Sequence, residues 1–408
     1  MKKIHLEEID GNSTGYFGLL AFFALFILAA LGSSYFMEHN GHWVTGMNNQ
    51  IVWGMPHVFA VFLIVAASGA LNVASISSVF RKTAYKPLAP LSAVLALALL
   101  TGGLMILVLD LGRPDRLIVA MTKYNFKSIF AWNMILYNGF FVVVGAYVWV
   151  MLDRTVKQYS HYAGLAAFIW RFALTTGTGS IFGFIVARSA FDAAIMAPMF
   201  IVMSFAFGLA IYILVLLSAY NGTGRELGDA VVNRLRNLLG VFVIGAFYFV
   251  LVYHLTNLYE TEHHGYESFI LLGENGGSSY SQIFWIGQII LGTLLPLAMI
   301  YAPGKMGNCR KVLSVASGLV IIGGLATMYT VIIAGQAYPM EMFPGMEVLE
   351  SSFHDGQVAQ YSATLAEYLL GIGGIAVSLF IITFAIKVLG LLPASLADDV
   401  ADPHYKAK

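Results

Sequence analysis

Apolar runs of 20 or more residues recur along nearly the whole 408-residue chain. A bilayer core of roughly 30 Å needs about 20 apolar residues per helix. Inside lipid the backbone must satisfy its own hydrogen bonds, as helices and closed barrels do. A barrel would show alternating segments of ~10 residues, which this sequence lacks. With 59% hydrophobic and 11% charged residues, the chain is predicted to be an all-α polytopic membrane protein.

The lengths of the apolar runs predict about ten membrane-spanning helices in one integral membrane domain, residues 1–408. The predicted limits are 15–37, 51–80, 88–110, 129–152, 163–187, 190–220, 238–260, 281–302, 311–337 and 363–393. We expect no cleavable signal peptide, because the first run is long enough to span and no small-residue cleavage site follows it.

The positions of lysine and arginine predict the orientation, because cytoplasmic loops carry an excess of both. With the N-terminus in the cytoplasm, 16 of the 22 basic residues fall in cytoplasmic segments. The predicted outer loops 38–50, 261–280 and 338–362 contain none. We therefore expect both termini in the cytoplasm. The exceptions are Arg171, Arg188, Arg113, Arg116, Lys123 and Lys127.

Charge and cysteine content exclude several classes of function. The formal net charge is zero, which gives no basis for a nucleic-acid partner. The single cysteine, Cys309, excludes an internal disulfide and any cysteine-ligated cluster or zinc site within this chain. We expect no metal site.

The segment Leu109–Arg116, Leu-Asp-Leu-Gly-Arg-Pro-Asp-Arg, places four charges directly after the third predicted span. Its arginines lie on the predicted outer side, against the positive-inside pattern. Either these charges belong to a site, or Asp110 and Asp115 simply neutralise Arg113 and Arg116 locally.

Polar side chains from eight predicted spans fall in the outer half of the membrane, and intramembrane ionisable groups tend to mark a site. A site of this kind suits a ligand with two polar oxygens and an apolar body, such as a quinone, because histidine and carboxylates exchange protons with it. The residues are His57, Asp110, Asn133, Tyr137, Asp192, His254, Asn257, Gln282, Gln288, Gln336 and Glu367.

Each of these residues also has a structural interpretation. The amide side chains, Asn133 among them, could bridge neighbouring helices and take no part in ligand binding. His57 follows Pro56 and could bond a backbone carbonyl that the proline frees. Glu367 and Asp192 could lie in the outer interface.

The segment Leu109–Arg116, with the following Asn125-Phe126-Lys127-Ser128, resembles the membrane subunits of the NrfD/PsrC (polysulfide reductase) family. Ala197-Pro198-Met199-Phe200 with Gly208, and Glu367 with Gly371 and Leu391-Leu392-Pro393, are also similar. The resemblance covers about residues 51–393. The segment 338–345 and Asp355-Gly356-Gln357 look most like the DsrP branch, from the DsrMKJOP complexes of sulfur metabolism.

The resemblance implies a multi-pass subunit of a prokaryotic inner membrane that is not catalytic alone. It would use quinone or menaquinone as an exchangeable substrate and hold no haem or iron–sulfur cluster itself. Its partners would be a ferredoxin-like iron–sulfur subunit on the periplasmic face and the other membrane and cytochrome subunits of a DsrMKJOP-like complex. It also implies two four-helix bundles, residues 51–187 and 190–337, with one extra helix at each end (15–37 and 363–393).

We predict that His57, Asp110 and Arg113 carry the chemistry of quinol oxidation or quinone reduction. Arg113 would hold Asp110 ionised or anchor a carboxylate of a partner. The quinone would be bound by His57, Asp110, Asn133, Tyr137 and Glu367. Of these, Asp110 and Arg113 match the motif, and the others depend on predicted depth alone.

Loop 338–362 is a candidate docking surface for the partner, or else a solvated cap over the bundle. Its acidic residues are Glu341, Glu347, Glu350 and Asp355.

Arg171 is the one basic residue deep inside a predicted span. It either begins a proton path toward the outer site or snorkels to the surface. The residues that would continue the path on the same helix are Thr175, Thr176, Thr178 and Ser180.

Two other functions stay open. A haem b cytochrome would use His57 and His254 as axial ligands of one haem. An ion-coupled secondary transporter would concentrate its polar residues at the midplane, whereas here they lie outward.

Overall fold

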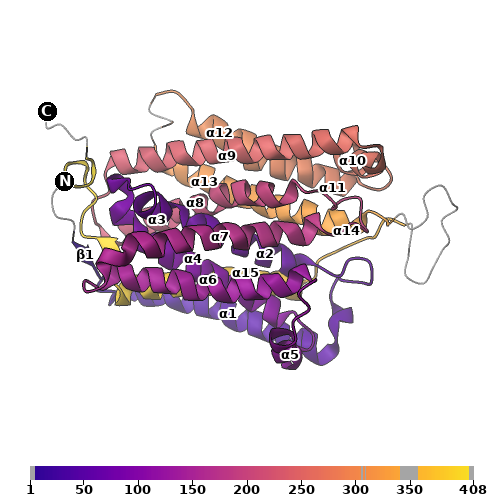
Figure 1. Ribbon diagram of the computed structural model, residues 1–408, viewed down its shortest axis with the longest axis horizontal. Helices are drawn as coiled ribbons and strands as arrows, with labels where there is room; N and C mark the ends of the chain where they lie inside the picture. Colours follow the sequence, from indigo (N-terminus) through magenta and orange to yellow (C-terminus); the bar gives the residue numbers. More distant parts are fainter. Residues whose placement is uncertain (1–4, 305–306, 308, 341–356, 404–408) are drawn as a thin grey trace.

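The computed structural model describes residues 5–304, 307, 309–340 and 357–403. Long helices run side by side along the longest axis of the molecule (Figure 1). Within these residues the strands are the two-residue segments β1 (Leu6–Glu7) and β2 (Leu392–Pro393). The predicted all-α polytopic membrane fold is confirmed.

Nine helical segments of the described chain are long and apolar enough to cross a membrane. They are α1 (Thr14–Asn40), α2 with α3 (Met55–Ala70, Asn72–Ser78), η2 with α4 (Thr83–Leu88, Ala89–Leu109), α6 (Ile129–Leu152), α8 (Met196–Thr223), α9 (Asp229–Tyr259), α11 with η7 and α12 (Ser278–Gln282, Ile283–Leu294, Leu295–Ile300), α13 with η8 and α14 (Arg310–Tyr329, Thr330–Ala334, Gly335–Ala337) and α15 (Leu365–Val388). The short elements are η1 (His42–Val44), η3 (Pro114–Arg116), α5 (Leu117–Thr122), η4 (Lys157–Tyr159), η5 (Thr261–His263), α10 (His264–Glu267), η6 (Ser268–Leu272) and α16 (Asp398–Ala401).

The remaining expected span, 163–187, corresponds to α7 (Ser160–Gly183), which packs against α6 and α8. It has 24 residues, as α6 has, but it carries Arg171 and several hydroxyl side chains and is less apolar than the other nine. Arg171, Thr175 and Thr178 are all buried. Because neighbouring helices cover its polar face, α7 fits within the bundle with fewer apolar residues than a lipid-facing helix needs.

Helix α2 lies at the centre of the molecule and packs against α4, α7, α8, α13 and α15. Its contact with α8 depends on small residues, which let two helix backbones approach closely. A Cβ atom on Gly69 would lie 1.6 Å from the carbonyl oxygen of Ser204, and one on Gly208 would lie 2.1 Å from the amide nitrogen of Ala70. Since α2 and α8 belong to different predicted bundles yet share one hydrophobic core, the division into two bundles stays a prediction.

The two flanking helices, α1 and α15, pack against each other, and α15 also packs against α4 and α2. α1 is therefore peripheral: only 17% of its apolar window is buried in the protein, against 94% for Met55–Ser78. A helix that exposes so much apolar surface is suited to contact lipid.

The beginning and the end of the chain meet at one end of the bundle, where β1 pairs antiparallel with β2. The Arg225 guanidinium donates to the backbone carbonyls of Glu7, Glu8, Leu392 and Pro393 and ties these segments together. We call this the proximal end and the opposite one the distal end; α5, α10 and α14 lie at the distal end (Figure 1). Which end faces the cytoplasm stays a prediction.

Some predicted helix limits were wrong. α9 begins at Asp229 rather than near 238, because polar residues such as Arg234 continue the helix beyond its apolar part. The last helix ends at Val388 rather than 393, because Leu392 and Pro393 form β2.

Candidate functional site

Asp110 ends α4 at the distal end of the bundle and lies between two histidines. Its Oδ2 is 3.2 Å from Nδ1 of His57, and its Oδ1 is 3.6 Å from Nε2 of His42. The Asp110 side chain is only 2% exposed, whereas those of His57 and His42 are 22% and 31% exposed. The result is a buried carboxylate between two imidazoles that partly reach the surface, an arrangement suited to proton exchange near neutral pH.

Local sequence explains how these groups meet. The amide of Asp110 makes the last bond of α4, to the carbonyl of Ile106 (3.0 Å), and Gly112 then turns the chain with a φ of +66°. α2 begins at Met55 with Pro56 in its first turn, where a missing N–H is tolerated. Pro56 therefore frees no carbonyl for His57, whose Nδ1 faces Asp110 instead.

The charges around Asp110 favour its ionised form. Burial raises the pKa of its carboxyl, but the contacts with His42 and His57 outweigh this effect and hold the pKa below its ordinary value. The same contact with Asp110 raises the pKa of the His42 imidazole above its ordinary value, against an opposing effect of desolvation. Both shifts favour a charged Asp110 carboxylate and a protonated His42 imidazole.

An aromatic wall stands beside His57. The ring of Trp53 lies 6.3 Å from the imidazole, 6.0 Å from the ring of Phe130 and 5.9 Å from the ring of Phe182, measured between centroids. Phe182 is buried, but Phe130 is 48% exposed. The partly exposed imidazole thus lies beside apolar aromatic rings that can contact a ring-shaped ligand.

Arg113 lies away from this group. Its guanidinium pairs with the carboxylate of Asp115 (Nε to Oδ1, 3.1 Å), and both side chains are largely exposed. The Arg113 guanidinium directs its hydrogen bonds to Asp115 rather than to Asp110. This geometry fits the interpretation in which neighbouring aspartates neutralise the arginines of this segment. The role of Arg113 in the chemistry stays a prediction.

Asn133 and Tyr137 share the buried face of α6, one helical turn apart. The Asn133 amide donates to the carbonyls of Ile129 (2.9 Å) and Gly177 (3.0 Å), so it bridges α6 and α7. Its oxygen accepts a long bond from Thr178 (3.5 Å). The bridging interpretation of Asn133 therefore fits its contacts, and a ligand role requires displacement of one of them.

Glu367 is fully buried and its carboxylate has several donors. It accepts bonds from the amides of Gly46 (2.9 Å) and Thr364 (2.7 Å), from the Thr364 hydroxyl and from the Tyr361 hydroxyl (2.6 Å). The Thr364 part is a capping box at the start of α15. Tyr361 in turn accepts from the amide of Met55, the first residue of α2 (2.6 Å). Glu367 thus positions the helix that carries His57.

A second clamp holds the segment just before α2. The Gln336 side chain accepts from the amides of Val52 and Trp53 (3.0 Å each) and donates to the carbonyl of Trp53 (2.9 Å). Arg188 donates to the carbonyls of Gln336 (2.8 Å) and Gln50 (3.0 Å). These contacts give a structural role to Arg188, one of the basic residues outside the predicted cytoplasmic segments.

His254, which also lies at the distal end, belongs to a different group. Its Nδ1 lies 2.8 Å from Oε2 of Glu267, and Oε1 of the same carboxylate accepts from the Asn257 amide. Each histidine proposed as a haem ligand thus faces its own carboxylate, Asp110 for His57 and Glu267 for His254. Over the described residues, no cluster of three or more histidine, cysteine or acidic side chains could hold a metal ion.

Comparison with known proteins bears on this geometry. A family model described as "Polysulphide reductase, NrfD" matches residues 43–340, which extend from η1 to the end of the α13–α14 segment. The chain belongs to the NrfD family. The matched region contains His57 and Asp110 and ends before α15, whereas the resemblance was expected to extend to about residue 393.

Three relatives of this NrfD-family chain cover nearly its whole length. An Hdr-like menaquinol oxidoreductase integral membrane subunit of Archaeoglobus fulgidus is 28% identical over 98% of this chain and 99% of its own. A selenate reductase subunit of Mesobacillus selenatarsenatis is 23% identical (90% and 92% covered). A putative dimethyl sulfoxide reductase membrane subunit of Halobacterium salinarum is 25% identical (96% and 94%). All three relatives are named as subunits of reductases or oxidoreductases.

Three residues near the distal polar groups of this NrfD-family chain were not identified from the sequence. His42 lies in the predicted outer loop 38–50, Trp53 at the start of the predicted span 51–80, and Glu267 in the predicted loop 261–280. That loop is largely helical, and Glu267 is fully buried rather than displayed to a partner. A histidine in a loop without any lysine or arginine was the one available signal for His42. Of the proposed docking loop, residues 341–356 lie outside the described residues.

Proposed function

We propose that this chain is the quinone-reactive membrane subunit of a multi-subunit oxidoreductase. It transfers electrons between a membrane quinol and an iron–sulfur partner bound at the distal end. The observation that carries the proposal is the buried Asp110 between His42 and His57, next to the aromatic wall of Trp53 and Phe130. The name of the Archaeoglobus relative, a menaquinol oxidoreductase subunit, supports menaquinol as the substrate class.

Quinol oxidation releases two protons and two electrons. His57 presents Nδ1 to Asp110, so its Nε2 is the nitrogen left to accept a proton from a quinol hydroxyl. The imidazolium formed in this way lies 3.2 Å from a carboxylate, which stabilises the new charge. His42, on the other side of Asp110 and 31% exposed, can pass a proton on to solvent at the distal surface.

The electrons require an acceptor outside this chain, because its single cysteine cannot ligate a cluster. We place the iron–sulfur partner at the distal end, close to Asp110, and predict that this end is periplasmic. The basic segment around Arg113 and α5 is exposed there and offers a surface for it. The relatives named as reductase subunits support a multi-subunit assembly. A DsrMKJOP-like set of partners is the narrower form of this proposal.

Proton movement through α7 is part of the proposal. Arg171 is buried and donates to the carbonyl of Ser68 (3.2 Å), so the snorkelling alternative is wrong. Thr175 donates to the Ser68 hydroxyl (2.6 Å), and Thr178 reaches Asn133 on α6. Thr176, which the sequence placed on the same proton path, is exposed and lies outside this row of buried groups. The buried groups form a polar row from the middle of α7 toward the distal site.

The test replaces His57 by glutamine in the purified complex and measures oxidation of a menaquinol analogue. His264→Gln is the matched control, since His264 is exposed and also distal. We expect the first variant to lose quinol oxidation and the control to keep it. Wild-type kinetics in His57→Gln would refute the proposal.

A further inference from the structure

A second buried acid–histidine pair lies at the distal end, in the part of the chain that follows α8. Glu267 is fully buried; its Oε2 is 2.8 Å from Nδ1 of His254 and its Oε1 accepts from the Asn257 amide (2.9 Å). The described contacts of this carboxylate include no lysine or arginine. A buried carboxylate without a permanent cation is stable mainly when a proton is shared with its neighbour.

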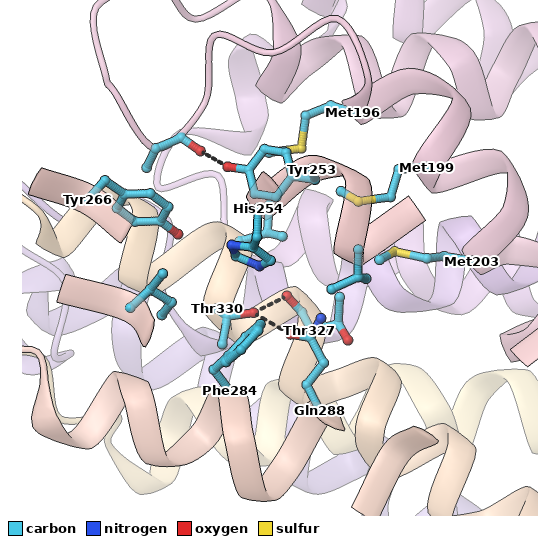
Figure 2. Close-up of a pocket in the computed structure, with 14 residues that line it drawn as sticks. Met196, Met199, Met203, Tyr253, His254, Tyr266, Phe284, Gln288, Thr327 and Thr330 are labelled. Atoms are coloured by element: carbon cyan, nitrogen blue, oxygen red, sulfur yellow. Dashed lines mark hydrogen bonds between the residues drawn. The ribbon is translucent and has the colours of Figure 1, made fainter. Parts of the chain in front are cut away.

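The imidazole of His254 borders a cavity. Figure 2 shows it projecting among Tyr253, Tyr266, Gln288 and Thr330. The cavity has a volume of about 20 Å³. A water molecule needs about 10–15 Å³ measured in this way, so the cavity accommodates one or two waters and is far too small for a quinone ring.

A second cavity shares lining residues with the first. Its volume is about 30 Å³, room for two or three waters by the same measure. Gln288 and Thr327 line both cavities and supply polar groups where they adjoin. The second cavity extends along the bundle to Gly292 and Val320, away from Glu267. Together the cavities lead from the acid–histidine pair into the interior of the bundle.

The helices around the cavities are irregular in a way that is frequent at functional sites. The three π-helical segments of the described chain, η6, η7 and η8, all contribute to the first cavity. The π-helix, with hydrogen bonds between residues five apart, is rare and is often found at functional sites. Side chains from these segments that line it are Ile270, Phe284, Gln288, Thr330 and Val331.

We infer that His254 and Glu267 form a second proton-exchange site, served by water in these two cavities and separate from the His57–Asp110 group. A hydronium ion in the cavity gives a proton to Nε2 of His254 and becomes water, and the proton on Nδ1 passes to Oε2 of Glu267. The imidazole returns to its neutral form, and the carboxylate becomes a carboxylic acid. The site takes hydronium and water as its ligands, and no electrons move in this step.

This inference rests on the proposed function, because quinol turnover is what would drive protons through the site. The experiment uses the native complex in liposomes that contain a pH-sensitive dye. It measures the rate of menaquinol-analogue oxidation with an uncoupler, and the number of protons moved per electron without one. The variants are Glu267→Gln and His254→Gln, with Glu260→Gln and His264→Gln as matched exposed controls at the same end.

We expect both cavity variants to oxidise quinol at the wild-type rate while protons moved per electron fall to those released by quinol itself. The controls keep the wild-type ratio. An unchanged ratio in Glu267→Gln overturns the inference, as does loss of quinol oxidation in that variant when it assembles normally. If Glu267→Gln does not assemble, the same proton-to-electron ratio is measured in Thr330→Val. That substitution removes the hydroxyl bonded to Gln288 (3.1 Å) and leaves Glu267 in place. A wild-type complex that oxidises no quinol refutes the proposed function, and this inference falls with it.

Discussion

Replacement of Asp110 by asparagine tests the quinol chemistry most directly. The substitution keeps the size of the side chain and removes the charge that lies 3.2 Å from His57 and 3.6 Å from His42. During quinol oxidation His57 gains a positive charge in the transition state. The carboxylate stabilises that charge, whereas a neutral amide stabilises it far less.

The size of the effect follows from the geometry. Two unit charges 3.2 Å apart attract by about 5 kcal/mol at an effective dielectric of ~20, and desolvation makes this an upper limit. The side chain of Asp110 is 2% exposed, so solvent screens the interaction little. One positioned acid–base group typically contributes about 10²–10⁴-fold to a rate. We expect kcat to fall by about 10²- to 10³-fold, which corresponds to about 3–4 kcal/mol.

The assay is steady-state oxidation of a menaquinol analogue by the purified complex, with thermal unfolding recorded in parallel to confirm assembly. Asp115→Asn is the matched control, because Asp115 lies in the same segment but is exposed and pairs with Arg113. We expect the control to oxidise quinol as the wild type does. An Asp110→Asn complex that assembles and turns over within a factor of about three of wild type refutes the reasoning, since that ratio is below 1 kcal/mol.

Stability should depend on pH through the same group. The folded pKa of Asp110 is lowered from 3.8 and that of His42 is raised from 6.5, so the stability difference between wild type and Asp110→Asn is largest between these two values. The stability difference declines as pH falls through the lowered pKa of Asp110 or rises through the raised pKa of His42. Unfolding midpoints of both proteins across pH measure this difference, and a difference that does not change with pH contradicts the prediction. Glu367→Gln should lose about 1–3 kcal/mol of stability, because one carboxylate oxygen becomes an amide donor that faces donors, and thermal unfolding reports the loss. Gly69→Ala should destabilise by about 1–3 kcal/mol or prevent assembly, because α8 backbone occupies the site of the new methyl group. Gly145→Ala in α6, with no neighbour within 4 Å, should leave the unfolding midpoint unchanged or raised, and equal effects of both glycine substitutions contradict the packing argument.

The site was only partly predictable from the sequence. Depth along a helix is a local property, so the apolar runs placed His57 and Asp110 in the same half of the membrane, and the structure brings the two side chains together. Depth says nothing about which direction a side chain takes. Glu367 therefore turned out to cap α15 and hold α2, and Asn133 to bridge α6 and α7. Both have the expected depth but their polar atoms are already bonded.

The sequence by itself determined the class of the protein and the order of its helices. Burial of apolar residues in lipid and the need for internal backbone bonds leave few alternatives to a helical bundle. Only the tertiary structure decided which polar groups meet. His42 reaches Asp110 because the α1–α2 link folds back over the end of α4, and Glu267 reaches His254 because the segment after α9 folds against it. Such contacts depend on how helices cross, as at Gly69 and Gly208, and crossing is set by close packing between segments far apart in sequence.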